Sequence, residues 1–266
     1  MQTLDLLEPT LNQLFIFAAI LTRIGGLVAV APLLGTNYAP LKIKGFIAVA
    51  LSLLLTPMFW DYQFVHPGNY MNFILVLGGE LFVGLSLGLG VRLLFTGVQI
   101  TGQLLGQVGG LSVADVFNPA MDSNVPLLAV LFDLVVLAIF LVIGGHRYLI
   151  SALLDTFHDI PPGVGGTSPE MTHVLVSILT SSFRLGVQAA APGTVALMMG
   201  VLVMGLISRT LPQLNVIAVG FSFNSMVLLI FIMLTIGSIG WVFQNSVEDS
   251  VNQVRDLIIN RVADST

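Results

Sequence analysis

Long apolar stretches separated by short polar connections dominate the pattern of hydrophobic and polar positions along this chain. A helix that spans a bilayer needs about 20 predominantly apolar residues. Seven stretches are candidates for helices at membrane depth, and they cover residues 11–34, 45–60, 71–95, 93–114, 126–143, 171–208 and 210–247. The pattern therefore predicts an all-α, integral membrane-associated protein.

Several of these stretches have an unusual length for a spanning helix. Residues 45–60 are few for an untilted span, and residues 210–247 would form a helix of about 57 Å, nearly twice the hydrocarbon thickness. Breakers such as Pro192 and Pro212 favour bent pieces or hairpins. Irregular backbone at membrane depth persists only when it is buried in protein or lines a wet cavity. We therefore expect kinked helical hairpins that pack largely against other protein; six ordinary spans with a few kinks are the alternative.

The composition supports a membrane location and excludes several classes of function. Hydrophobic residues make up 56% of the 266 residues and charged residues only 9%, against about 25% charged residues in soluble domains. The net charge of −5 supplies no basic stripe for phosphates, so we expect no nucleic-acid partner. The chain has no cysteine, which excludes disulfides, thiol catalysis and thiolate metal sites.

Motifs of enzyme active sites are missing from the sequence. The four histidines are far apart, and no Gly-x-Ser-x-Gly, His-Glu-x-x-His or phosphate-binding glycine motif occurs. An intramembrane enzyme would need a nucleophile and a base in one cavity, and no such pair stands out. We expect a protein that is not an enzyme and that uses no cofactor and no metal ion.

Ionisable residues inside the apolar segments are candidates for function, because such groups are unfavourable in a membrane unless they are paired or hydrated. They are Arg23, Glu80, Arg92, Asp133 and Arg184. On a straight helix Glu80 and Arg92 lie about 18 Å apart and about 120° around the axis, so each needs a partner on another segment or another chain. Structural ion pairs between helices are favoured over a proton path, because the acids do not line one face. The alternative is a small-molecule or ion transporter that uses Glu80, Arg92 and Asp133.

The connection at 109–124 combines apolar side chains with residues that bend the backbone. Its apolar members are Val113, Val116, Phe117 and Met121, beside glycines, prolines and two aspartates. A plug or gasket that folds back into an assembly would use the apolar side chains to seal and the glycines and prolines to bend. A plain surface loop needs only the residues that bend the backbone. Glycines four apart, at 84 and 88 and at 102, 106 and 110, indicate close helix contacts.

Motifs along nearly the whole length resemble the type III secretion export-gate family of FliR/SpaR/YscT-like proteins. The most specific is the run 209–216, in which Pro212, Gln213, Asn215 and Val216 match the Pro-Gln-x-Asn-Val signature. Further matches are the Ala-Pro-Leu-Leu-Gly run at 31–35, Lys44-Gly45, Leu55-Thr56-Pro57, Gly79-Glu80 and Asn118-Pro119, and residues 145–158 are similar to the flagellar branch. Ile217 and Asn118 depart from the family, which usually has Phe and Asp at these positions.

The resemblance implies a FliP-like helical region at 1–208, a FliQ-like helical hairpin at 209–247 and a polar C-terminal tail at 248–266. It implies co-assembly with FliP and FliQ homologues, contact with FlhA and FlhB homologues, and passage of unfolded exported proteins. The implied location is the bacterial cytoplasmic (inner) membrane at the flagellar basal body, with energy supplied by other components.

The resemblance also implies roles for particular residues. The loop at 109–124 would plug the closed gate, through Gly109, Gly110, Val113, Val116, Phe117, Asn118, Pro119 and Met121. The ionisable residues would become assembly contacts between subunits, and these are Arg23, Glu80, Arg92, Asp133, Arg184 and Arg209.

Overall fold

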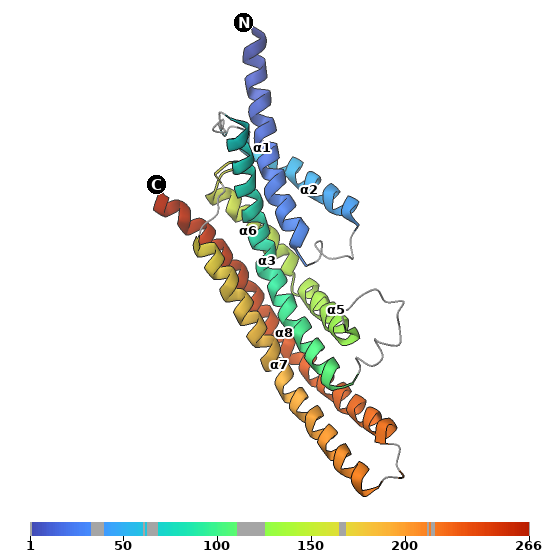
Figure 1. The fold of residues 1–266 in the computed structure, drawn as a ribbon. Helices are drawn as coiled ribbons and strands as arrows, with labels where there is room; N and C mark the ends of the chain where they lie inside the picture. Colours follow the sequence, from blue (N-terminus) through green and yellow to red (C-terminus); the bar gives the residue numbers. More distant parts are fainter. Residues whose placement is uncertain are drawn as a thin grey trace. The chain divides into compact units, whose positions relative to one another are not determined.

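The computed structural model of the chain describes residues 2–32, 40–60, 62, 69–110, 126–164, 169–211, 213 and 216–265. Every regular element among these residues is a helix (Figure 1). In chain order they are α1 (Gln2–Val30), α2 (Leu41–Leu55), the 3₁₀-helix η1 (Thr56–Phe59), α3 (Tyr70–Val108), α5 (Leu127–Val142), α6 (Gly145–Asp159), α7 (Pro169–Thr210) and α8 (Val216–Ser265). Four helices are long and apolar enough to cross a membrane, or five if α5 and α6 count as one span. The prediction of an all-α membrane protein is confirmed.

Several helices are longer than the stretches predicted from hydrophobicity. Residues 71–95 and 93–114 were expected as two segments, but Tyr70–Val108 form the single helix α3 of 39 residues. The short stretch at 45–60 belongs to an apolar helical segment that begins at Leu41 and ends at Phe59. Glycine lowers the helix propensity by only about 1 kcal/mol per residue, which tertiary packing offsets, so glycines inside α3 do not end the helix.

The last third of the chain differs from the hairpin expected within 209–247. Helix α7 continues through Pro192 to Thr210, and α8 is one helix of 50 residues that includes most of the tail expected at 248–266. Prolines and glycines are tolerated inside membrane helices because neighbouring helices, Ser and Thr side chains and local adjustments of the helix satisfy the freed backbone groups. The division into FliP-like and FliQ-like parts stays a prediction.

The chain divides into two compact units, and each unit is built from separate stretches of sequence. The first unit contains Met1–Arg92, Gly144–Ile178 and Val247–Thr266, and the second contains Leu93–Ile143 and Leu179–Ser246. Three helices, α3, α7 and α8, contribute to both units. One change between the units, at Val247, lies beside the boundary predicted at 247, and none lies at 208.

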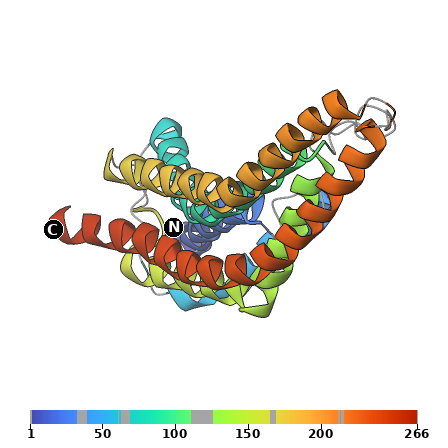
Figure 2. The ribbon, with the colours of Figure 1, turned by 90° about the horizontal axis from the view of Figure 1, so that it is seen from below.

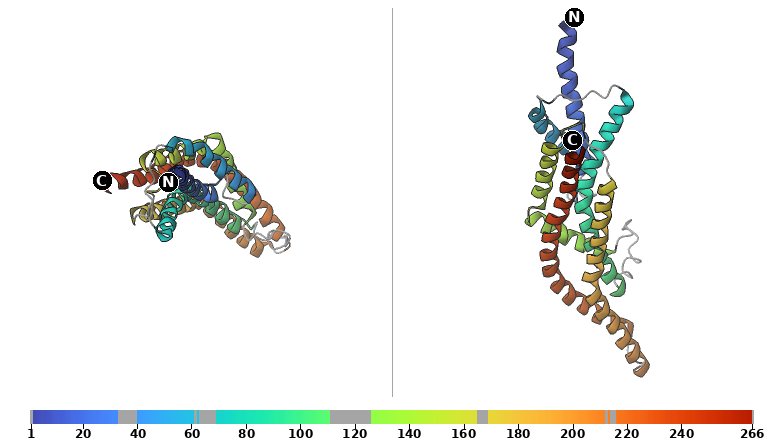
Figure 3. Two further views of the ribbon diagram at one scale, coloured as in Figure 1. Left: turned by 90° about the horizontal axis from the view of Figure 1, so that it is seen from above. Right: turned by 90° about the vertical axis from the view of Figure 1, so that its left-hand side faces the viewer.

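The core of the first unit lies between α1 and the first half of α3, which run side by side in both views (Figures 1 and 3). Ile16, Ile20 and Ile24 of α1 are fully buried, and Val83 and Leu87 of α3 are buried as well. A spacing of four residues places each set on one face of its helix. Apolar packing therefore surrounds the polar groups that lie at the same depth.

The core of the second unit is built around Phe95 of α3. Its ring makes edge-on contacts with Phe140 of α5 at 5.5 Å and with Phe243 of α8 at 5.3 Å, between ring centroids. Helices α7 and α8 run antiparallel beside their connection (Figure 2). A side-chain carbon at Gly200 would meet the ring of Phe223, and one at Gly193 would meet Phe231. These glycines let the two helices approach closely.

Candidate functional site

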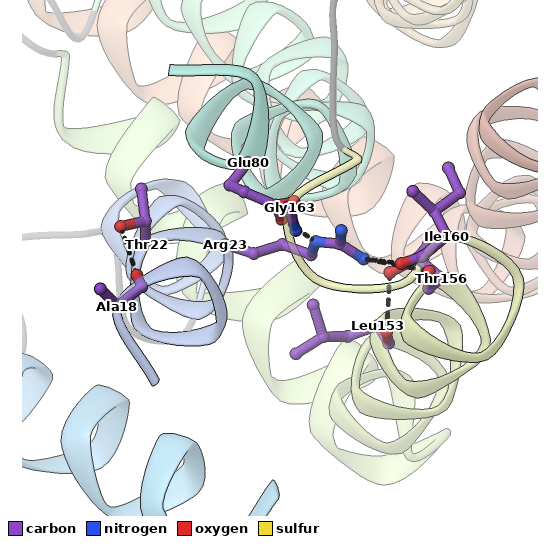
Figure 4. Close-up of polar contacts among 8 residues, drawn as sticks. All are labelled: Ala18, Thr22, Arg23, Glu80, Leu153, Thr156, Ile160 and Gly163. Atoms are coloured by element: carbon purple, nitrogen blue, oxygen red, sulfur yellow. Dashed lines mark hydrogen bonds and ion pairs between the residues drawn. The ribbon is translucent and has the colours of Figure 1, made fainter. Parts of the chain in front are cut away.

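An ion pair buried between α1 and α3 is the main polar site of the first unit (Figure 4). Arg23 Nε donates a hydrogen bond of 2.6 Å to Glu80 Oε2, and both side chains are 0% exposed. Glu80 of α3 thus pairs with Arg23 of α1, another helix, as expected from the distance between Glu80 and Arg92 on their own helix. Removing two charges from water is unfavourable, and hydrogen bonds to the other donors and acceptors of the pair offset part of this cost. Arg23 Nη2 is the guanidinium nitrogen that finds no hydrogen-bond partner among the described residues.

The segment that ends α6 supplies most of the remaining partners. Arg23 Nη1 donates to the carbonyl oxygens of Thr156 at 3.0 Å and Ile160 at 3.1 Å, where the end of a helix carries partial negative charge. The backbone N–H of Gly163 donates to Glu80 Oε1 at 2.8 Å. Gly163 has a φ of 98°, a left-handed conformation that favours glycine. The ion pair therefore links three parts of the chain: α1, α3 and the end of α6.

Two aromatic residues complete the surroundings of the ion pair. The guanidinium carbon of Arg23 lies 4.3 Å from the ring centroid of Phe157, a cation–π contact. Burial raises the pKa of the Tyr62 hydroxyl, and the negative charge of Glu80 raises it further. The Asn12 amide donates to the Tyr62 carbonyl at 3.0 Å, which ties α1 to the connection after η1. These contacts favour a fixed structural cluster over a path along which protons move.

Glycines allow α1 and α3 to approach closely enough for this pair to form. A side-chain carbon at Gly84 would overlap the carbonyl oxygen of Arg23, and one at Gly26 would lie 2.7 Å from the Leu81 carbonyl oxygen. At Gly88 it would lie 3.1 Å from the Leu27 carbonyl oxygen. The glycines at 84 and 88 that the sequence singled out thus lie at a contact between helices of the same chain.

The second unit contains a separate set of polar contacts between helices. Gln99 of α3 donates to Asp133 of α5 at 2.7 Å, and Asp133 is buried. Thr101 of α3 donates to the Gly186 carbonyl of α7 at 3.0 Å. A side-chain carbon at Gly102 would lie 2.8 Å from the Leu128 carbonyl oxygen. Asp133 is therefore held by an amide within its own unit.

The other predicted charges have different environments in the isolated chain. Arg92 is half-buried, whereas Arg184 and Arg209 of α7 are exposed. Within one chain, α7 presents these two positions outward. Their role as contacts to other subunits stays a prediction.

Most of the predicted plug and part of the family motif lie outside the described residues. This applies to Val113, Val116, Phe117, Asn118, Pro119 and Met121 of the plug and to Pro212 and Asn215 of the motif. Gly109 and Gly110 follow α3, and Gly110 has a φ of 80°. Gln213 is exposed, and Val216 begins α8.

Sequence reasoning missed the partners that the backbone supplies to the ion pair. These partners are the backbone N–H of Gly163 and the backbone carbonyls of Thr156 and Ile160. Nearly every residue type carries such backbone groups, so composition cannot identify which of them bind the ion pair. The Pro161-Pro162-Gly163 run was the available signal, because it predicts a turn directly after a helix. Among the described residues, no group of three or more His, Cys, Asp or Glu side chains is placed to hold a metal ion.

The fold and the site define an all-α membrane protein in which ionised side chains connect helices. A family model described as bacterial export proteins, family 1, matches residues 14–250. The chain belongs to this family.

Three relatives illustrate the range of similar proteins. The flagellar biosynthetic protein FliR of Escherichia coli (strain K12) is 30% identical over 80% of this chain and 81% of its own length. The FliR protein of Aquifex aeolicus is 29% identical over 91% and 94%. The secretion system apparatus protein SsaT of Salmonella typhimurium is 23% identical over 73% and 75%. Similarity therefore extends over most of the chain in both flagellar and secretion-system proteins.

Proposed function

We propose that this chain is a structural, non-enzymatic subunit of the flagellar type III protein-export gate in the bacterial inner membrane. It would co-assemble with FliP and FliQ homologues at the flagellar basal body, contact FlhA and FlhB homologues, and pass unfolded flagellar subunits. Membership of the bacterial export family over residues 14–250 supports this function, as do the names of the flagellar relatives.

The observation that carries the proposal is the large apolar and mixed surface that α7 leaves uncovered. Within the chain, only 22% of an 18-residue apolar stretch of α7 is buried, against 50% of the corresponding stretch of α3. Small and polar residues such as Ser177, Ser181 and Ala191 are exposed there together with Phe183 and Arg184. Small residues are typical of helix interfaces at membrane depth, and an exposed arginine needs a charged or polar partner. This surface therefore suits other protein subunits.

The plug role belongs to the loop at 109–124. Gly110, in a left-handed conformation, follows the end of α3 at Val108, and Pro126 precedes α5. Apolar side chains between these two ends would exclude water from the closed path, and the assembly would open when they move aside.

Replacing Val113, Val116, Phe117 and Met121 together by serine is expected to make cells leak small ions. Serine hydroxyls bind water, so a seal made by apolar contacts would become hydrated. The membrane potential, followed with a dye, would fall in cells that make this variant. Copurification of the partner subunits would report that the gate still assembles.

The matched control replaces Ser112 and Ser123 of the same loop by glycine and is expected to keep the membrane tight. A serine-substituted loop in an assembled gate that leaks no more than this control would contradict the plug role.

The alternative, a transporter that uses Glu80, Arg92 and Asp133, has less support. Both oxygens of Glu80 accept hydrogen bonds inside the first unit, and Asp133 accepts one from Gln99. We expect the purified chain alone to show no saturable solute transport in vesicles and to be stable mainly with partner subunits. Saturable transport by the single chain would favour the alternative.

A further inference from the structure

We propose that the segment Leu41–Phe59, formed by α2 and η1, is a surface of this chain that faces the acyl chains of the lipid bilayer. Lys42 would lie at one interface of the bilayer and Trp60 at the other. This inference goes beyond the gate function, because it concerns the lipid and not the subunits or the exported proteins.

The first evidence is the exposure of large apolar side chains in this segment. Within the chain, only 11% of an 18-residue apolar stretch of this segment is buried, although α2 packs against α1. Phe46 is 75% exposed, and Leu54 and Met58 are each 72% exposed. Side chains this large and apolar need cover from lipid or from protein.

The distribution of side-chain sizes favours lipid over protein. The two buried residues of α2 are Ala48 and Ser52, which are small. The outward residues are bulky, and the large ones after Lys44 are Phe46, Val49, Leu53, Leu54, Met58 and Trp60. Helix contacts at membrane depth are enriched in small residues that let backbones approach. The inner side of α2 fits this description, whereas its outer side fits contact with flexible acyl chains.

The two hydroxyl groups of the segment are hydrogen-bonded within it. Ser52 Oγ donates to the Ala48 carbonyl at 2.6 Å, and Thr56 Oγ1 donates to the Ser52 carbonyl at 2.7 Å. Across residues 45–60, all of which are described, the exposed residues carry no polar side chain except the indole of Trp60. Hydrocarbon accepts such a surface, since both hydroxyl groups find acceptors inside the segment.

The length and the ends of the segment match a bilayer. Its two helices together measure about 30 Å, and the hydrocarbon core is about 30 Å thick. Lys42 is exposed at one end, and Trp60 is 56% exposed at the other. Lysine extends its ammonium group to anionic headgroups, and tryptophan prefers the interface. The two residues are therefore placed to anchor opposite ends of the span.

The test uses the intrinsic fluorescence of Trp60. The chain has two tryptophans, so Trp241→Phe leaves Trp60 alone. The full chain, purified with the subunits that accompany it, is placed in vesicles of phosphatidylcholine and phosphatidylglycerol brominated either near the headgroup or near the chain ends. Trp60 should be quenched several-fold more by bromine near the headgroup. With Trp60→Phe added, a tryptophan introduced by Leu53→Trp should be quenched more by bromine near the chain ends.

A matched control separates this inference from the gate proposal. Phe183 of α7 is 57% exposed and Leu53 is 59% exposed, and subunits would cover Phe183 in the assembled gate. A tryptophan introduced by Phe183→Trp, with both native tryptophans replaced by phenylalanine, should be quenched little by either lipid. Strong quenching there would count against the assembly while leaving the lipid contact of α2 intact. No quenching at positions 53 and 60 by either lipid would overturn the inference.

Discussion

Replacing Glu80 by alanine is expected to destabilise the folded chain by about 3–5 kcal/mol, because Arg23 then stays buried without its counter-charge. The pair is 0% exposed, so water cannot take the place of the carboxylate without opening the contact between α1 and α3. Unfolding of the chain copurified with its partner subunits in mixed detergent, followed by the loss of helical circular dichroism relative to the unsubstituted complex, measures the change.

Two further variants make this expectation specific to the buried pair. Arg23→Met combined with Glu80→Leu removes both charges and should recover part of the lost stability, because apolar residues of similar volume often replace a buried pair. The recovery is incomplete because the Gly163 N–H and the Ile160 carbonyl lose their side-chain partners. Asp256→Ala removes the acid from an exposed pair with Arg255, 3.0 Å apart, and should change stability by no more than about 1 kcal/mol. A Glu80→Ala protein as stable as Asp256→Ala would refute the structural role of the pair.

Replacing Gly84 by alanine is expected to destabilise the first unit by about 1–3 kcal/mol or more, the range for overpacking. The added carbon would overlap the carbonyl oxygen of Arg23. A backbone atom has no alternative rotamer, so α1 and α3 must separate, and the hydrogen bond between Arg23 and Glu80 must lengthen. The same unfolding measurement detects this loss.

Gly78→Ala is the matched control for this substitution. Gly78 lies on the same helix, is exposed, and has nothing within 4 Å of an added carbon. There alanine should be neutral or should stabilise the helix by about 0.5–1 kcal/mol, through its better helix propensity. Equal effects at positions 78 and 84 would show that propensity, and not the helix contact, explains the change.

Hydrophobicity alone was enough to predict helices at membrane depth, because the energetic penalty of bringing polar groups into lipid acts on each segment separately. It was a weaker guide to where helices end. Residues 71–114 contain many glycines and glutamines, yet α3 continues from Tyr70 to Val108. Packing on other helices decided its length, and a window of sequence carries no information about that packing.

The sequence by itself determined that Arg23, Glu80 and Asp133 require partners, since ionised groups are unfavourable in an apolar segment, and its motifs placed the chain in its family. Only the tertiary structure decided which partners they have. Arg23 and Glu80 are 57 residues apart, and two of the groups that complete their site are backbone carbonyls at the end of α6. Backbone groups are the same in every residue, so only the path of the folded chain selects which of them meet the charges.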